Sequence, residues 1–170
     1  CETLEESGAE ILVSPNGSPY HRGKMELRQS VVVSRVVETG LPMAYLNLLG
    51  GQDDQVFDGG SFVLNRGGAL AVQMPQFEAG LEHVEFEHGD DGWVAAPGVK
   101  ASLPEEYEAD YRVMVMALGD YLRKTGFKSV VLGLSGGIDS AIVATIASDA
   151  IGPENVHCVM LPSRFTSEVS

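Results

Sequence analysis

The stretch Val130-Val131-Leu132-Gly133-Leu134-Ser135-Gly136-Gly137-Ile138-Asp139-Ser140 decides the fold class of this chain. Its first half is continuously apolar, which predicts a strand over 130–134 that is covered on both faces. A helix is predicted over 140–150, and a second apolar strand over 156–161. A strand, a helix and a strand without polar alternation are typical of parallel βαβ units, so we expect an α/β fold with a doubly wound parallel sheet.

The loop between this strand and this helix has the features of an anion site. A strand that leads directly into a helix points several backbone N–H groups and the positive helix terminus at one place. Gly136 and Gly137 have no Cβ atom, so a polyphosphate can approach their backbone, while Ser135 and Ser140 add hydroxyl donors. Asp139 would repel phosphates unless a cation intervenes, and Mg²⁺ shared between its carboxylate and the phosphates resolves that conflict.

The same loop has two other interpretations. The lysine of a Gly-x-x-x-x-Gly-Lys motif is missing, which excludes an ordinary P-loop nucleotidase. The remaining alternative is a helix N-cap next to flexible glycines, without any ligand.

The residues upstream predict an α/β unit that is rich in hairpins. We expect helices over 3–8 and 24–39, a turn over 57–60, and a linker that follows the last strand of this unit. The expected strands are 11–13, stopped by the turn-rich segment 14–19, then 42–49, 61–64, 69–73 and 82–87, with a hairpin turn over 65–68.

An amphipathic helix is predicted over 105–125, after a polar and turn-rich stretch. Its acidic residues come early and Arg123 and Lys124 come late, as the helix dipole favours. We therefore place a first domain over 1–98, a linker over 99–110 and a second domain over 111–170.

Composition excludes several classes of function. The 170 residues contain 11 Lys and Arg against 24 Asp and Glu, and this net charge of −13 argues against a phosphate-neutralising nucleic-acid surface. No apolar run approaches the roughly 18 residues that cross a membrane. Two cysteines form no disulfide framework and suggest a reducing, cytoplasmic compartment, and the four histidines show no zinc-ligand spacing.

Because the chain starts at Cys1 and stops soon after Thr166, we interpret it as a fragment.

The loop Ser135-Gly136-Gly137-Ile138-Asp139-Ser140 resembles the pyrophosphate loop of the N-type ATP pyrophosphatases. The wider stretch 133–170, with Val159-Met160-Leu161-Pro162-Ser163-Arg164-Phe165-Thr166-Ser167, resembles the NAD synthetases in particular. Arg164 is either near the adenosine of ATP or a solvated surface charge. The resemblance implies an ATP site made by Gly133, Leu134, Ser135, Gly136, Gly137, Ile138, Asp139, Ser140, Leu161 and Ser163, with Asp139 as the ligand of Mg²⁺.

The first part resembles the nitrilase-type amidases. The resemblance rests on Gly8-Ala9-Glu10-Ile11-Leu12-Val13-Ser14-Pro15-Asn16-Gly17-Ser18-Pro19-Tyr20 and on Gly50-Gly51-Gln52-Asp53-Asp54 with Val56-Phe57-Asp58-Gly59-Gly60-Ser61. A nitrilase-like glutaminase ahead of an ATP pyrophosphatase is the layout of the glutamine-dependent NAD synthetase family. It implies the C-terminal part of a nitrilase-like α/β sandwich, followed by the start of an adenine nucleotide alpha hydrolase-like domain.

The family resemblance implies a ligase that amidates deamido-NAD to NAD, with ATP and glutamine as substrates and AMP and pyrophosphate as products. It assigns Ser18 and Lys24 to glutamine binding, and their alternatives are a turn hydroxyl and a solvated charge. We expect a cytoplasmic homo-oligomer with no nucleic-acid or membrane partner. Gln52, Asp53 and Asp54 are expected to be turn residues rather than site residues.

No catalytic residue is assigned within the chain. We expect the glutaminase Glu, Lys and Cys to lie upstream, because Cys1 would fall inside the first helix rather than on a nucleophile turn. The isolated chain is therefore expected to be inactive. The alternatives are another glutamine-dependent amidotransferase with the same loop, a synthetase fused to an inactive amidase, and a non-catalytic fragment.

Overall fold

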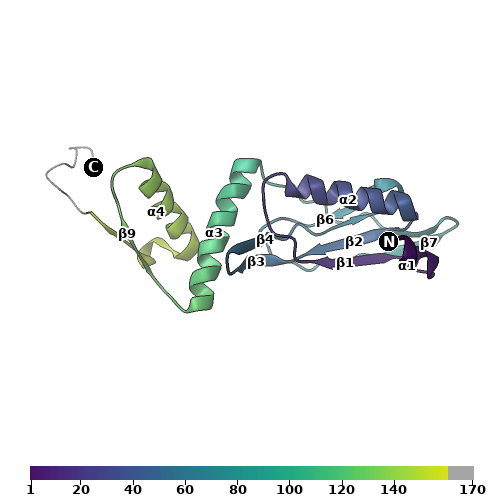
Figure 1. Ribbon diagram of the computed structural model, residues 1–170, viewed down its shortest axis with the longest axis horizontal. Helices are drawn as coiled ribbons and strands as arrows, with labels where there is room; N and C mark the ends of the chain where they lie inside the picture. The colour runs from purple at the N-terminus through teal and green to yellow at the C-terminus, as the bar shows by residue number, and fades with distance from the viewer. Residues whose placement is uncertain (161–170) are drawn as a thin grey trace. The chain divides into compact units, whose positions relative to one another are not determined.

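The computed structural model describes residues 1–160, which divide into two compact units (Figure 1). Unit 1 contains Cys1–Gly50 and Phe57–Ala109. Unit 2 contains Gly51–Val56 and the chain from Asp110 onward. A six-residue segment from the first half of the sequence is therefore part of the second unit.

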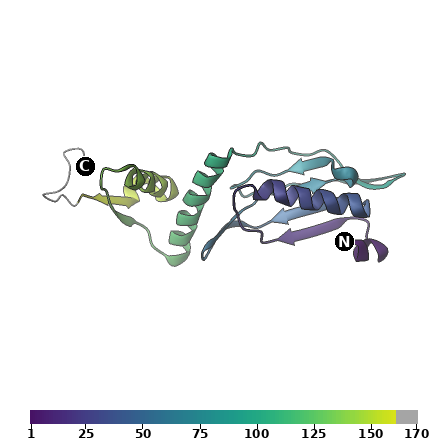
Figure 2. The same ribbon diagram turned by 45° about the horizontal axis from the view of Figure 1, so that its top comes forward.

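Unit 1 is built on a four-stranded sheet with the strand order β1-β2-β5-β6. β1 and β2 are parallel, and the pairs β2–β5 and β5–β6 are antiparallel. α2 lies along one face of this sheet (Figure 2). The elements of the chain up to residue 98 are α1 (Glu2–Glu6), β1 (Leu12–Asn16), α2 (Lys24–Thr39), β2 (Met43–Asn47), β3 (Leu49–Gln52), β4 (Gln55–Asp58), β5 (Phe62–Leu64), the 3-10 turn η1 (Arg66–Gly68), β6 (Leu70–Gln73), β7 (Phe86–Gly89) and β8 (Gly92–Ala95).

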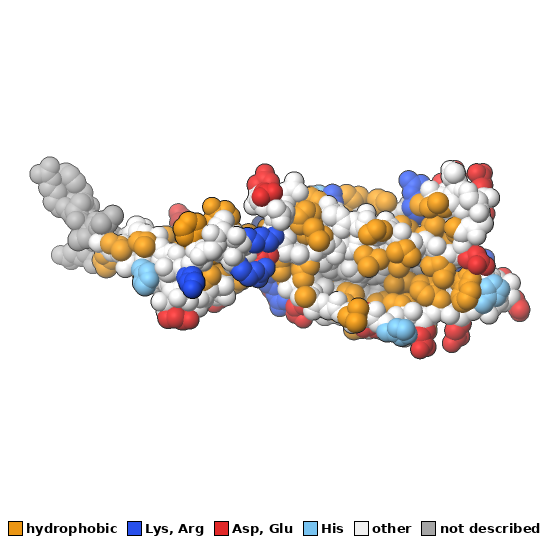
Figure 3. Space-filling model, turned by 90° about the horizontal axis from the view of Figure 1, so that it is seen from below, with side chains coloured by type: hydrophobic (Ala, Val, Ile, Leu, Met, Phe, Trp, Pro, Cys, Tyr) orange, Lys and Arg blue, Asp and Glu red, His pale blue; other side chains and the backbone are white. Residues whose placement is uncertain are grey.

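The sheet buries apolar side chains on both of its faces, because successive residues of a strand point to opposite sides. Under α2 the core contains Leu12, Val32, Val36, Met43, Phe62 and Leu64. On the other face it contains Val63, Ala71, Val72 and Ala95. That second face is incompletely covered, since Val13 and Leu46 remain exposed, and Figure 3 shows hydrophobic side chains gathered there.

The helix over 24–39 and the hairpin around 65–68 are confirmed with their predicted bounds or close to them. The predicted stop of the first strand is wrong, because β1 continues through Pro15 to Asn16. β1 lies at the edge of the sheet, where a proline is tolerated because it need not donate to a ladder. The predicted turn over 57–60 is half wrong, since its first two residues belong to β4 while Gly59 and Gly60 have positive φ.

The strand expected over 82–87 is shifted toward the C-terminus. It begins at Phe86 and pairs with β8, a strand that the sequence analysis missed. Gly92 has a φ of +99°, which permits the tight turn and sets the register of this hairpin. A little further on, the backbone N–H groups of Gly98 and Ala101 donate to β6, and Gln73 of β6 donates to Val99. Residues 98–101, where the expected first domain ends and the expected linker begins, therefore run along the edge strand β6.

Unit 2 has the strand, helix and strand order that the sequence predicts. β9 (Val130–Gly133) and β10 (Val156–Val159) are parallel, and α4 (Ile138–Ile151) connects them through the short turn η2 (Pro153–Asn155). α3 (Glu106–Thr125) precedes them and ends before Gly126, as predicted. The mixed α/β fold class is thus confirmed. In the part of the chain that the structure describes, Val131 of β9 is 74% exposed, so this strand is not covered on both of its faces there.

None of the helices within residues 1–160 is both long enough and apolar enough to span a membrane.

Candidate functional site

The loop between β9 and α4 presents its backbone to solvent. Gly137 is the N-cap of α4 with an extended backbone, at φ −83° and ψ 160°. Gly136 has a φ of +78°, a conformation that glycine adopts without strain. A Cβ atom at Gly137 would meet only the Ser135 Oγ atom, at 3.5 Å. The space in front of Gly137 is therefore open to a ligand.

The two serines of this loop gather their hydroxyl groups at the start of α4. Ser135 Oγ and Ser140 Oγ are 3.1 Å apart, and the Ser140 hydroxyl also lies 2.9 Å from the Gly137 carbonyl oxygen, to which it donates. The Gly137 N–H donates to Ser135 Oγ at 3.3 Å. These bonds hold the loop in a closed turn and keep both hydroxyls at the helix N-terminus.

This arrangement can bind an anion. The first N–H groups of an α-helix have no partner within the helix, and the positive end of the helix dipole lies at the same point. Asp139 lies in the first turn of α4 and is exposed. Within residues 1–160 no three His, Cys, Asp or Glu side chains converge as a protein-only metal cluster. The donor set therefore fits Mg²⁺ held by one carboxylate together with ligand phosphates, which is how this ion is commonly bound.

Three residues of the expected ATP region, Leu161, Ser163 and Arg164, lie outside the described residues.

Ser18 and Lys24 lie on either side of the turn that leads into α2. Lys24 is the first residue of α2 and lines a pocket of about 260 Å³ in unit 1. Asp58 and Gln76 also line this pocket. Ser18 is half-buried and is not among the residues that line it; its Oγ atom is 3.1 Å from Arg28 Nε.

A buried ion pair between Arg28 and Asp58, which the sequence analysis missed, lies between Ser18 and the pocket, because Arg28 contacts Ser18 and Asp58 lines the pocket. Arg28 Nη2 and Nη1 donate to Asp58 Oδ1 and Oδ2 at 2.7 and 2.8 Å, and both side chains are almost fully buried. Gln76 Nε2 donates to the same Asp58 Oδ2 atom. One signal was available, because Arg28 precedes the core residues Val32 and Val36 at a spacing of four and so lies on the buried stripe of α2.

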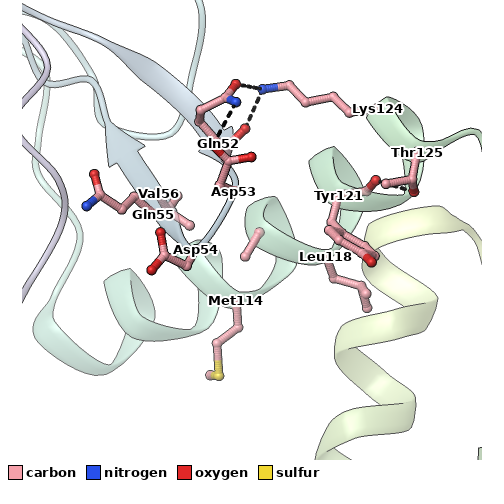
Figure 4. Close-up of a pocket in the computed structure, with 12 residues that line it drawn as sticks. Gln52, Asp53, Asp54, Gln55, Val56, Met114, Leu118, Tyr121, Lys124 and Thr125 are labelled. Atoms are coloured by element: carbon pink, nitrogen blue, oxygen red, sulfur yellow. Dashed lines mark hydrogen bonds between the residues drawn. The ribbon is translucent and has the colours of Figure 1, made fainter.

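A larger pocket of about 670 Å³ lies in unit 2, between the tip of the β3–β4 hairpin and α3 (Figure 4). Lys124 Nζ donates to the Gly51 carbonyl oxygen and to Gln52 Oε1, and the Gly51 N–H donates to Asp120 Oδ2 at 2.7 Å. Asp53 has a φ of +53° in the turn of this hairpin. These contacts explain why the hairpin tip belongs to unit 2.

Hydrogen bonds shift the pKa values of Tyr111 and Glu38. Tyr111 donates to Asp149 Oδ2 at 2.6 Å, and this hydrogen bond raises the pKa of Tyr111 above its usual 10.0, with smaller contributions from desolvation and from the carboxylate charge. Arg35 donates to Glu38 at 2.7 Å, and this bond lowers the pKa of Glu38. Both pairs are accessible to solvent and lie outside the glycine loop.

Cys1 is exposed and forms the N-cap of α1. The sequence analysis placed it inside the helix, which is wrong by one residue, because the helical conformation begins at Glu2.

The fold and the loop place the chain among α/β proteins that have a glycine-rich loop between a parallel strand and a helix. Unit 2 is a parallel strand–loop–helix–strand unit with a glycine loop at its helix N-terminus, and unit 1 is an α/β unit that precedes it in the sequence. The family model described as NAD synthase matches residues 110–170, which cover the main segment of unit 2.

Similarity to individual proteins is more specific. The chain is 61% identical to a glutamine-dependent NAD(+) synthetase of Rhodobacter capsulatus over 98% of its length, and 42% identical to one of Xylella fastidiosa over 96%. A solved glutamine-dependent NAD+ synthetase from Acinetobacter baumannii, in complex with adenosine diphosphate, superposes with a TM-score of 0.91 at 39% identity over 99% of this chain.

The chain spans about 30% of the length of these curated relatives and 32% of the solved chain. The resemblance to the glutamine-dependent NAD synthetases that the sequence predicts is confirmed, and it extends over both units.

Proposed function

We propose that this chain is a segment of an enzyme that amidates deamido-NAD to NAD, with ATP and glutamine as substrates. The observation that carries the proposal is the similarity to glutamine-dependent NAD(+) synthetases through both units, at 61% identity over 98% of the chain. In this proposal unit 1 belongs to the glutaminase part and unit 2 to the synthetase part. The boundaries expected from the sequence are 1–98, a linker over 99–110, and 111–170.

The glycine loop of unit 2 is proposed to bind the pyrophosphate portion of ATP. The N–H groups at the start of α4 and the hydroxyls of Ser135 and Ser140 would donate to phosphate oxygens, and open backbone at Gly137 would let those oxygens approach. Leu134 and Ile138 flank the loop, and Gly133 ends the preceding strand.

Asp139 is proposed to hold Mg²⁺ beside the phosphates. When bound, Mg²⁺ neutralises part of the negative charge that leaves with pyrophosphate. The mutual hydrogen bonds of the loop keep both hydroxyls at the start of α4. Their protons would turn from these bonds to the phosphate oxygens when ATP binds. The reaction so supported is activation of the deamido-NAD carboxylate by ATP, followed by attack of ammonia and release of AMP.

In unit 1, Ser18 and Lys24 are proposed to bind glutamine, the source of that ammonia. Lys24 contributes a positive charge to the edge of the pocket in unit 1, where a substrate carboxylate can pair with it. The proposal also includes a homo-oligomeric, cytoplasmic enzyme, as the family resemblance implies.

The test separates the two half-reactions in the full-length enzyme that carries this sequence. We expect Asp139→Ala and Gly137→Val to lower ammonia- and ATP-dependent NAD formation by on the order of 100-fold, while glutamine hydrolysis stays near the parent rate. Gly137 has a φ that any residue adopts and an open Cβ direction, so its substitution should not disturb the fold.

Glu154→Ala is the matched control, because it removes an exposed carboxylate of unit 2 outside the loop. Near-normal NAD formation by the Asp139→Ala enzyme would refute the assignment of the loop.

A further inference from the structure

The pocket of about 670 Å³ in unit 2, which we call the α3 groove, has an apolar wall made by α3. Met114, Ala117, Leu118 and Tyr121 line it, and their spacing of three and four residues places them on one face of the helix. Met114 is 42% exposed and Tyr121 is 55% exposed. This face of α3 is therefore uncovered within residues 1–160.

The opposite wall of the α3 groove is the acidic tip of the β3–β4 hairpin, where Asp53 and Asp54 lie (Figure 4). Gln52 Nε2 donates to Asp53 Oδ2 at 3.2 Å, whereas no described residue pairs with the Asp54 carboxylate. The cation of the groove, Lys124, donates to the Gly51 carbonyl oxygen and to Gln52 Oε1. The groove thus combines an apolar wall with an unpaired negative charge.

The hairpin tip is held in place before any partner binds. The Gly51 N–H donates to Asp120 Oδ2 at 2.7 Å, and Asp120 is 9% exposed. Arg123 Nη2 lies 2.7 Å from the other carboxylate oxygen of Asp120. A wall fixed in this way loses little conformational freedom on association, which favours binding.

The segment that follows α3 has the complementary chemistry. Phe127 is 62% exposed and is not among the residues that line the α3 groove. Lys128, the next residue, is also exposed, and no described residue pairs with its ammonium group. Aromatic side chains that fill a pocket on the partner are the usual anchors of protein interfaces. Phe127 and Lys128 therefore match the apolar wall and the free carboxylate of the groove.

The position of this segment favours a symmetric pairing. Phe127 lies two residues beyond Thr125, the last residue of α3 that lines the groove. Because the aromatic side chain and the groove lie at the same end of α3, a two-fold axis beside that end brings each Phe127 to the groove of the other copy. Such an isologous contact closes with two chains and leaves neither groove empty.

We propose that the α3 groove is an interface between two copies of this chain, in which Phe127 of one copy fills the groove of the other and Lys128 pairs with Asp54. The inference deepens the homo-oligomer of the proposed function and rests on it, since it names the surface through which two copies associate.

The experiment measures the dissociation constant of self-association of the full-length enzyme that carries this sequence, by sedimentation velocity over a concentration series. Phe127→Ser should raise this constant by on the order of 100-fold, because the anchor is lost from two symmetry-related contacts. Asp54→Lys and Lys128→Asp should each raise it about tenfold or more, because like charges then face each other.

These three positions are exposed, so their substitution should not disturb folding of the chain. Glu154→Lys is the matched control, because it reverses an exposed charge of unit 2 outside the groove. It should leave the dissociation constant unchanged.

Mixing the two charge-reversed enzymes distinguishes contacts between copies from contacts within one polypeptide. In a mixed dimer of Asp54→Lys with Lys128→Asp, opposite charges face each other at both contacts, so an equimolar mixture should associate nearly as well as the parent. The double variant Asp54→Lys/Lys128→Asp should do the same.

Two results would overturn the inference while the homo-oligomer stands. One is a parent-like dissociation constant in all three single variants. The other is association that is restored in the double variant but not in the mixture, which would show that a segment of the same polypeptide fills the groove. A parent enzyme that stays monomeric at every concentration would show that the homo-oligomer of the proposed function is itself wrong, whereas the amidation reaction is judged separately by NAD formation.

Discussion

Replacing Arg28 by methionine should strongly destabilise unit 1. The substitution keeps most of the side-chain volume but removes both donors to Asp58, which lie at 2.7 and 2.8 Å from its carboxylate oxygens. Asp58 is completely buried, so water cannot replace the lost donors, and Gln76 is the partner that remains to it. An uncompensated buried charge of this kind costs about 3–5 kcal/mol of the free energy of unfolding.

The assay is urea unfolding of the chain, followed by tryptophan fluorescence. Trp93, the single tryptophan of the sequence, lies in β8 of unit 1, so its emission reports the unit that contains Arg28 and Asp58. Arg35→Ala is the matched control on the same helix: its ion pair with Glu38 is accessible to solvent, and we expect little change in stability.

A second variant tests whether charge burial is the cause. Arg28→Met combined with Asp58→Asn removes both charges, and it should be more stable than Arg28→Met alone by at least about 1 kcal/mol. A cost below about 1 kcal/mol for Arg28→Met, or a double variant no more stable than the single one, would refute the reasoning.

Two further predictions follow from the described contacts. Folding raises the pKa of Tyr111 above 10.0, mainly through its hydrogen bond to Asp149, so the stability that this pair contributes is complete below about pH 10 and is lost as pH rises through the folded-state pKa. The Tyr111→Phe chain should therefore lose less stability than the parent chain between about pH 9 and pH 11 in urea unfolding. Equal losses in the two chains would contradict this prediction. Cys1→Ser should leave the rate of glutamine hydrolysis by the full-length enzyme within a few-fold of the parent rate, because Cys1 is an exposed helix N-cap and serine is favoured at that position. A collapse of glutamate release in a folded variant would instead identify Cys1 as the nucleophile.

The helices and the glycine loop were predictable because their signals are local. Apolar spacing of three and four residues marks α2 and α3, and glycines with positive φ follow both helices, at Gly40 and Gly126. The sequence predicts an apolar strand over 130–134 and a helix over 140–150, and the structure has the same order, with α4 beginning two residues earlier, at Ile138. Each of these features depends on residues within one or two turns of the chain.

The network around Ser18 was not predictable in the same way. Arg28 and Asp58 are 30 residues apart, and a charged residue on a predicted helix is exposed far more often than it is buried. The spacing of Arg28 with Val32 and Val36 indicated burial, but nothing near Asp58 in the sequence identified it as the partner. Only the pairing of strands brings these two side chains together.

Periodicity, capping glycines and the strand–loop–helix order thus determined the α/β class, the position of the glycine loop and the bounds of the longer helices. The tertiary structure alone decided that Pro15 lies within an edge strand, that residues 98–101 follow β6, and that the hairpin tip 51–56 joins unit 2. The physical reason is that a local signal sets the conformation of a segment, whereas its partner, its burial and its place at an edge depend on contacts with segments that are distant in the sequence.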